Sequence, residues 1–138
     1  RVEGRQGALD LGVQTIEPRG AACAVIGGER PFGVIGTHLD LSGLWRRRQA
    51  RAILDQLAAE PDLPTLLMGD MNEWRAAAGC PADFAATHKL VLTGPSFPAR
   101  APLARLDRIF ASNEMQIEDS GVHQSPLAKV ASDHLPLW

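Results

Sequence analysis

The sequence has no hydrophobic run that approaches the ~18 residues required by a transmembrane helix. It also shows no charged segment followed by an apolar one at its start, so we expect neither a membrane span nor an intact signal peptide in these 138 residues. Neither sign of charge dominates, because the net charge is only −2 at pH 7. Any binding of phosphate groups must therefore come from a local site and not from a generally basic surface.

Cysteine is scarce, and the two that are present, Cys23 and Cys80, form no CxxC or Cys/His spacing. This excludes a structural zinc site and a disulfide-rich scaffold. Cys23 lies within an apolar run, which favours a buried free thiol over a disulfide. Free thiols are typical of a reducing compartment, so we predict a cytoplasmic protein.

Internal repeats and low-complexity segments are also absent, and we expect a single unit over residues 1–138. Apolar and polar residues alternate over 7–16, whereas 21–26 and 32–39 are more continuously apolar, and turn residues separate the three segments. This pattern predicts a three-stranded antiparallel meander. A helix is expected over 42–60, where Ser42 can act as the cap. The outer face of this helix carries four arginines, namely Arg46, Arg47, Arg48 and Arg51.

Residues 64–70 form a short apolar run that closes on Gly-Asp, as expected for a central strand that ends at a site. Residues 75–105 look irregular apart from a short helix at 82–87. Further strands are predicted at 106–111, 115–122 and 135–138. The predicted fold class is therefore α+β, with one mixed, mostly antiparallel sheet and helices on one face.

Four polar clusters adjoin these apolar segments. They are Thr37-His38-Leu39, Gly69-Asp70-Met71-Asn72, Arg105-Leu106-Asp107-Arg108-Ile109 and Ser132-Asp133-His134. Side chains from distant parts of the sequence converge where strands end at one edge of a sheet. We therefore expect two histidines, three aspartates and one asparagine to come together.

This set of side chains suits the hydrolysis of a phosphodiester. A hard divalent cation prefers carboxylate and amide oxygens, so Asp70 and Asp133 can bind the metal or activate a water molecule. Asn72 can donate a hydrogen bond to a phosphoryl oxygen. His38 or His134 can do the same, or exchange protons near neutral pH.

Each cluster taken alone also has a simpler interpretation. Gly-Asp-x-Asn is a common loop sequence, and His38 could be a histidine satisfied at a strand end. Asp107 stands between Arg105 and Arg108, where a structural ion pair is the more frequent role. The hypothesis of a catalytic site depends on the four clusters occurring together, each next to an apolar strand.

The four clusters together resemble the endonuclease/exonuclease/phosphatase superfamily, which includes deoxyribonucleases, abasic-site endonucleases, sphingomyelinases and inositol-phosphate phosphatases. Phe97-Pro98-Ala99-Arg100, followed by the Asp107 cluster, is similar to a small bacterial phosphodiesterase-like branch. The resemblance implies that Asp133 orients His134 and can touch the metal, while His134 faces the scissile phosphate. Asp70 would position or deprotonate the attacking water.

The resemblance also implies roles for four other residues. Asn72 and His38 would contact the phosphate, and Asp107 would support a histidine. Arg5 would match an arginine of the family that precedes the first strand. The implied cofactor is Mg²⁺ or Mn²⁺.

Domains of this family are about twice as long and pack two sheets face to face in a four-layer α/β/β/α sandwich. The resemblance covers only the C-terminal half, so the chain is expected to form half of such a sandwich. The other half normally supplies an Asn and the Glu that is the principal metal ligand. Neither Glu3 nor Glu73 stands in the right context to replace that Glu. We therefore expect the isolated 138 residues to bind metal weakly and to have little activity.

The leading hypothesis is that the full-length protein is a metal-dependent phosphoesterase acting on nucleic acid, a phospholipid head group or a nucleotide. The alternative is a noncatalytic interaction domain that retains the fold, and an upstream Asn and strand-terminal Glu would argue against it.

Strands 21–26 and 65–68 are apolar on both faces, whereas one helix can cover only one face. A homodimer, or the missing half, is expected to cover the other.

Overall fold

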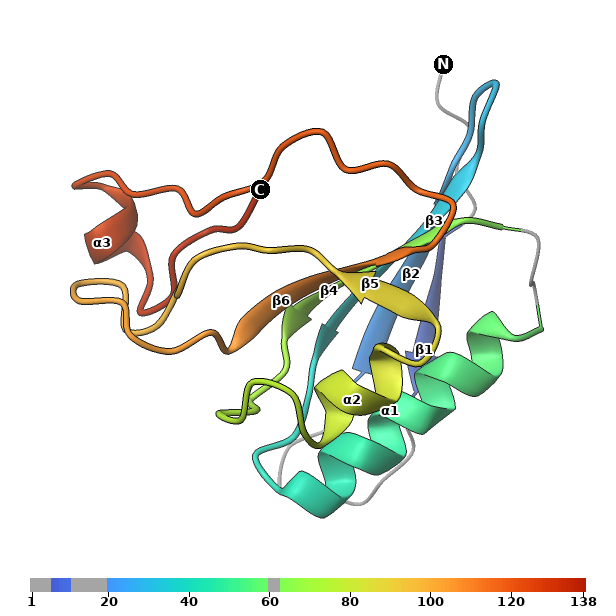
Figure 1. Cartoon of the computed structure of the whole chain (residues 1–138), viewed down its shortest axis with the longest axis horizontal. Helices are drawn as coiled ribbons and strands as arrows, with labels where there is room; N and C mark the ends of the chain where they lie inside the picture. Colours follow the sequence, from blue (N-terminus) through green and yellow to red (C-terminus); the bar gives the residue numbers. More distant parts are fainter. Residues whose placement is uncertain (1–5, 11–19, 60–62) are drawn as a thin grey trace.

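A mixed six-stranded sheet forms the centre of the computed structural model, which describes residues 6–10, 20–59 and 63–138 (Figure 1). The strand order is β1-β2-β3-β4-β6-β5. The elements, in chain order, are β1 (Gln6–Asp10), β2 (Gly20–Ile26), β3 (Phe32–His38), α1 (Gly43–Leu57), β4 (Thr65–Asp70), α2 (Cys80–Phe84), β5 (His88–Leu90), β6 (Asp107–Ser112) and α3 (Ala128–Ala131).

The first three strands form the predicted antiparallel meander. Residues 11–16 of the first predicted strand lie outside the described residues. From β3 the chain crosses over through α1 to β4, which pairs with β3 in parallel. Strand β6 then pairs antiparallel with both β4 and β5. The sheet is therefore mixed and mostly antiparallel, as the sequence indicated.

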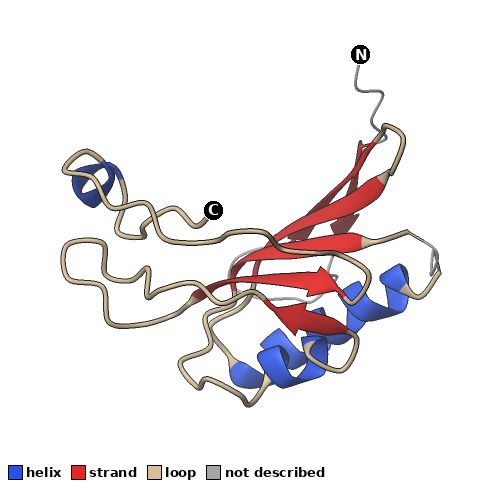
Figure 2. Cartoon of the chain, turned by 45° about the horizontal axis from the view of Figure 1, so that its top comes forward, coloured by secondary structure: helices blue, strands red, loops and turns tan. Residues whose placement is uncertain are grey.

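Helices α1 and α2 pack against one face of the sheet (Figure 2). The core between them includes Ile35 of β3, Leu67 of β4, Phe110 of β6 and Ile53 of α1, each at most 5% exposed. These strand residues are paired neighbours in register, so they point to the same face. No helix of the described residues is long and apolar enough to cross a membrane.

The helix predicted over 42–60 is confirmed over Gly43–Leu57, but its polar face differs from the expectation. Arg47, Arg48 and Arg51 are exposed as predicted, whereas Arg46 is only 7% exposed. Arg46 turns inward because Glu73, three residues after β4, offers it a buried carboxylate. Ser42 precedes the helix without a side-chain cap bond.

The C-terminal part departs furthest from the predicted pattern. The strands expected at 115–122 and 135–138 reduce to one isolated bridge between Val122 and Leu137. Pro136 lacks the N–H that a longer ladder would require at its position. Two elements were not predicted, the short strand β5 and helix α3, and the helix expected at 82–87 occurs earlier, at Cys80–Phe84.

The sheet face opposite α1 and α2 carries Val34, Leu66, Met68 and Ile109, all half-buried. These residues alternate with the buried residues of the helix-covered face. In the part of the chain that the structure describes, α1 and α2 lie only on the other face (Figure 2). The described fold is thus a sheet with one helical layer.

The parallel pairing of β3 and β4 depends on a glycine. Gly69 has φ 140°, in the region that favours glycine, and it is in register with Thr37. A Cβ at Gly69 would lie 1.8 Å from the carbonyl oxygen of Thr37. Only a residue without a side chain allows the two strands to approach this closely.

We therefore predict that Gly69→Ala lowers the free energy of unfolding by roughly 2–4 kcal/mol, because strain in the backbone adds to the clash. The matched control is Gly36→Ala, in the same strand pair, where a Cβ would meet nothing within 4 Å. Its expected change is less than about 1 kcal/mol. Urea unfolding of both variants is the measurement, and equal effects would contradict the prediction.

Candidate active site

Three neighbouring strands place three of the predicted site residues side by side. In the register of the sheet, His38 at the end of β3 pairs with Asp70 at the end of β4. Asp70 in turn pairs with Asp107 at the start of β6. Directly paired residues point to the same face of the sheet, so His38, Asp70 and Asp107 share one face. It is the face that α1 and α2 do not cover. Three of the six residues that were expected to come together, His38, Asp70 and Asp107, therefore lie side by side.

His134 reaches this row from the C-terminal segment. Its Nδ1 lies 2.7 Å from Oδ2 of Asp107, and an ionised carboxylate can only accept, so Nδ1–H donates. Its Nε2 then faces Asp70, 3.9 Å from Oδ2. The surrounding backbone is anchored to the loop before β6, since the N–H of Ala99 donates to the carbonyl of Asp133 at 2.7 Å.

Asp70 lies between two imidazoles. Its Oδ2 is 3.4 Å from Nε2 of His38 and 3.9 Å from Nε2 of His134. The side chain of Asp70 is 15% exposed and that of His38 is 57% exposed. A partly buried carboxylate with two ring nitrogens near one oxygen can accept a proton or hold a polar ligand.

The surroundings of His134 favour its protonated form. Burial lowers the pKa of His134, but the hydrogen bond and charge of Asp107, together with the charges of Asp70 and Asp133, outweigh burial and raise the pKa above its usual value. The ring also packs against Phe97, with centroids 4.8 Å apart. His134 is thus held in one orientation by a carboxylate and an aromatic ring.

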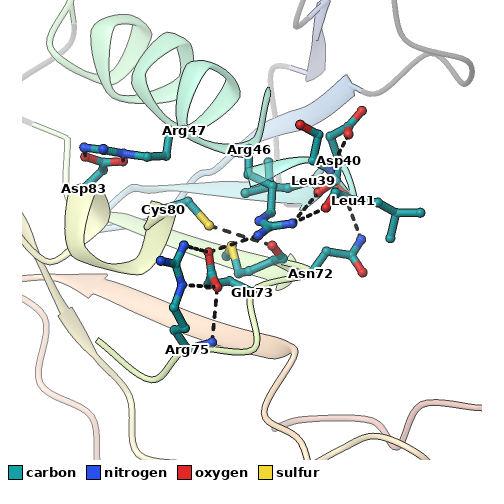
Figure 3. Close-up of polar contacts among 12 residues, drawn as sticks. Leu39, Asp40, Leu41, Arg46, Arg47, Asn72, Glu73, Arg75, Cys80 and Asp83 are labelled. Atoms are coloured by element: carbon teal, nitrogen blue, oxygen red, sulfur yellow. Dashed lines mark hydrogen bonds and ion pairs between the residues drawn. The ribbon is translucent and has the colours of Figure 1, made fainter. Parts of the chain in front are cut away.

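Asn72 connects two loops at this edge. Its side-chain Nδ2 donates to the carbonyl oxygen of Leu39 at 2.8 Å (Figure 3). Its backbone N–H donates to Oδ1 of Asp70 at 2.8 Å. Its φ of 48° is in the left-handed region, which asparagine tolerates better than most residues. The amide of Asn72 therefore already has one structural partner.

The family resemblance implied that Asp107 supports a histidine and that Asp133 orients His134, and only the first of these is a direct contact in the structure. Asp107, not Asp133, hydrogen-bonds to the ring of His134. Asp133 is exposed, and its carboxylate lies 3.5 Å from the hydroxyl of Ser132. Arg5 lies outside the described residues.

Asp107 forms no ion pair with its neighbouring arginines among the described residues. Arg108 points to the helix-covered face, where it donates to the carbonyls of Glu73 and Arg75 at 2.9 and 3.0 Å. Sequence reasoning missed Ser96, a fully buried residue whose hydroxyl donates to Oδ2 of Asp107. A serine in a proline-rich loop carries no signal by which it could have been found.

A divalent cation does not fit the described residues on their own. They contain no group of three or more His, Cys, Asp or Glu side chains that could hold a metal ion. Glu73 is excluded as a substitute ligand, because it is 3% exposed and ion-paired to Arg46 and Arg75. Hydrogen bonds from Arg75, together with one from Arg46, lower the pKa of Glu73 to about 2, although burial of the carboxylate acts in the opposite direction.

The fold and the sequence both have relatives. The uncharacterized protein YbhP of Escherichia coli K12 is 30% identical over 140 residues, which cover 93% of this chain and 54% of YbhP. The chain thus spans about half the length of the curated relatives it matches. Among solved structures, a mannosyl-6-phosphatase from Bacteroides thetaiotaomicron superposes with a TM-score of 0.81 at 19% identity, covering 96% of this chain and 64% of that one.

Another solved structure with the same fold is TDP2 of D. rerio in complex with a single-strand DNA product. Its TM-score is 0.74 at 17% identity, and the match covers 99% of this chain and 67% of that one. The family model of the Endonuclease/Exonuclease/phosphatase family matches residues 8–134, a span that includes all four polar clusters. With this match over nearly its whole length, the chain belongs to the endonuclease/exonuclease/phosphatase family.

Proposed function

We propose that this chain supplies part of the active site of a phosphoesterase that hydrolyses a phosphate ester with an activated water molecule. The observation that carries the proposal is the position of Asp70, whose Oδ2 lies close to the Nε2 atoms of both His38 and His134. A carboxylate beside two proton donors provides a base for water and donors for a phosphoryl group at one place.

Each residue then has a role that its contacts allow. Asp70 accepts the proton that the attacking water loses as the new P–O bond forms. The P–O bond to the alcohol of the ester breaks in the same step, and the departing alkoxide takes a proton from solvent. The Nε2–H of His134, oriented by Asp107 at Nδ1, donates to a phosphoryl oxygen and stabilises its growing charge. His38 contacts the phosphate from the other side of Asp70, and Asn72 donates with the amide hydrogen not bonded to Leu39.

The family match and the related structures support this reaction class and leave the substrate open. One structural relative is named a mannosyl-6-phosphatase and another is bound to a DNA product. Nucleic acid, a phospholipid head group and a nucleotide all present the phosphate ester that the site would use. The net charge of −2 weighs mildly against a large DNA-binding surface.

We expect His134→Ala, Asp70→Ala and Asn72→Ala in the full-length protein each to lower turnover by ~10² or more, because each removes an acid–base or electrostatic contribution. The measurement is hydrolysis of bis(p-nitrophenyl) phosphate and p-nitrophenyl phosphate. His123→Ala is the matched control, since His123 is exposed and its side chain bonds only to Ser125 in the described structure. Near-normal hydrolysis by His134→Ala would rule out the assignment.

Mg²⁺ or Mn²⁺ is proposed as the cofactor of the full-length protein, with its principal Glu ligand outside this chain. Asp70 and Asp133 could add oxygen ligands, but two carboxylates leave a hard cation mostly hydrated. Calorimetric titration of the 138 residues with either ion should therefore show no binding tighter than about millimolar. Micromolar affinity in this chain would contradict the proposal that a ligand lies elsewhere.

The apolar sheet face opposite α1 and α2 is proposed to be covered by protein. A second copy of the chain could do so through a two-fold interface, and so could the residues that relatives carry beyond the matched half. For the isolated chain we predict a dimer by light scattering, or a monomer that binds a hydrophobic dye. A monomer that binds no such dye would show that this face is already covered.

A further inference from the structure

Arg46 links two loops that carry the proposed active-site residues. Its Nη1 donates to the carbonyl oxygens of Leu41 at 2.5 Å and of Asp40 at 3.3 Å, in the loop that follows β3 (Figure 3). Its Nη2 donates to Oε2 of Glu73 at 3.1 Å, in the loop that follows β4. One guanidinium therefore holds together the chain segments just beyond His38 and just beyond Asn72.

Glu73 is held firmly in its place. Besides Arg46 it accepts hydrogen bonds from Nε of Arg75 at 3.0 Å and from the backbone N–H of Arg75 at 3.2 Å. A Cβ on Gly79, whose φ is 70°, would come within 2.3 Å of Oε2 of Glu73. The backbone thus closes tightly around the carboxylate, and its position relative to Arg46 has little freedom.

The loops joined in this way determine the geometry of the site. Asn72, next to Glu73, donates its backbone N–H to Oδ1 of Asp70 and its side chain to the carbonyl of Leu39. Leu39 in turn follows His38. The orientation of the Asp70 carboxylate therefore depends on Asn72, and the position of Asn72 depends on the ion pair between Glu73 and Arg46.

Stability alone does not explain such a pair. A buried ion pair loses much of its Coulombic gain to the desolvation of its two charges, and a protein in which apolar residues replace the pair is often equally stable. What the pair adds is a fixed geometry between the two segments that carry it. We propose that Arg46 and Glu73 are positioning residues, which hold Asp70 and Asn72 in their catalytic arrangement without touching the substrate. This inference rests on the phosphoesterase function proposed above.

The decisive variant is Arg46→Met in the full-length protein. Methionine keeps an unbranched side chain of similar reach but releases the loop at Leu41, while Glu73 remains paired with Arg75. We expect kcat to fall about tenfold or more and KM to change less than about threefold, because a small displacement of catalytic groups lowers the rate steeply. Circular dichroism must show the variant folded at the assay temperature.

Arg47→Met is the matched control at the next position of the same helix. It breaks the exposed pair between Arg47 and Asp83, which joins α1 to α2 away from the site loops. Its kcat should stay within about twofold of the unchanged protein. If Arg46→Met does not fold, Arg46→Lys replaces it, because a lysine keeps the charge but cannot match the several contacts of the guanidinium fork.

A second test separates positioning from general destabilisation. Arg46 acts partly through the side chain of Asn72 and partly through its backbone N–H, which Asn72→Ala keeps. Adding Arg46→Met to Asn72→Ala should therefore lower kcat further, but by a smaller factor than Arg46→Met does alone. A full additional loss, or a single variant whose kcat stays near normal, would overturn the proposal. If His134→Ala loses activity but Arg46→Met keeps a normal kcat, the positioning role of Arg46 is refuted and the phosphoesterase function stands. If His134→Ala remains active, the phosphoesterase function itself is refuted.

Discussion

The parallel pairing of β3 and β4 is the constraint on which the other features depend. It brings His38 and Asp70 into register at the carboxyl ends of adjacent strands, and it allows β6 to add Asp107 to the same row. The close approach of Gly69 to Thr37 shows how little space this pairing leaves. A shift by one residue would turn Asp70 toward the helices, since neighbouring strand residues point to opposite faces.

The alternation of side chains along the strands separates chemistry from packing. Asp107 faces the site and bonds to His134, while the next residue, Arg108, is buried toward the helices and holds the loop after β4. Leu67 and Asp70 are three positions apart in β4, so their side chains point to opposite faces of the sheet. Leu67 lies in the core under the helices, and Asp70 lies on the face of the site. A single short segment can therefore supply both a residue of the proposed site and part of its support.

Two layers of polar contacts surround the row of site residues. Ser96 and His134 both bond to Asp107, and Asn72 bonds to Asp70 from the next turn of the chain. Behind them, Glu73 and Arg46 connect the loops from the helix-covered side. The row of candidate site residues thus lies on a sheet that α1 and α2 cover on one face and that carries half-buried apolar side chains on the other.

Much of this arrangement followed from the sequence alone. Apolar periodicity and turn residues predicted the meander, α1, β4 and β6, because these elements have strong local patterns. The clusters around His38, Asp70, Asp107 and His134 were recognised because each adjoins such a strand. Their side-by-side order was not predicted, since register depends on pairing between segments distant in the chain.

Only the tertiary structure decided which partner each polar residue takes. Asp107 rather than Asp133 bonds to His134, and Arg46 turns inward to Glu73 while Arg47 stays exposed. From the sequence, Arg46 and Arg47 shared one expectation, a place on the outer face of the helix, and the family resemblance assigned the orientation of His134 to Asp133. The hydrophobic pattern of the sequence determined the helices and strands, because it is a local property of the chain. The polar contacts of the site depend on which donors and acceptors the fold brings together, so only the three-dimensional packing determined them.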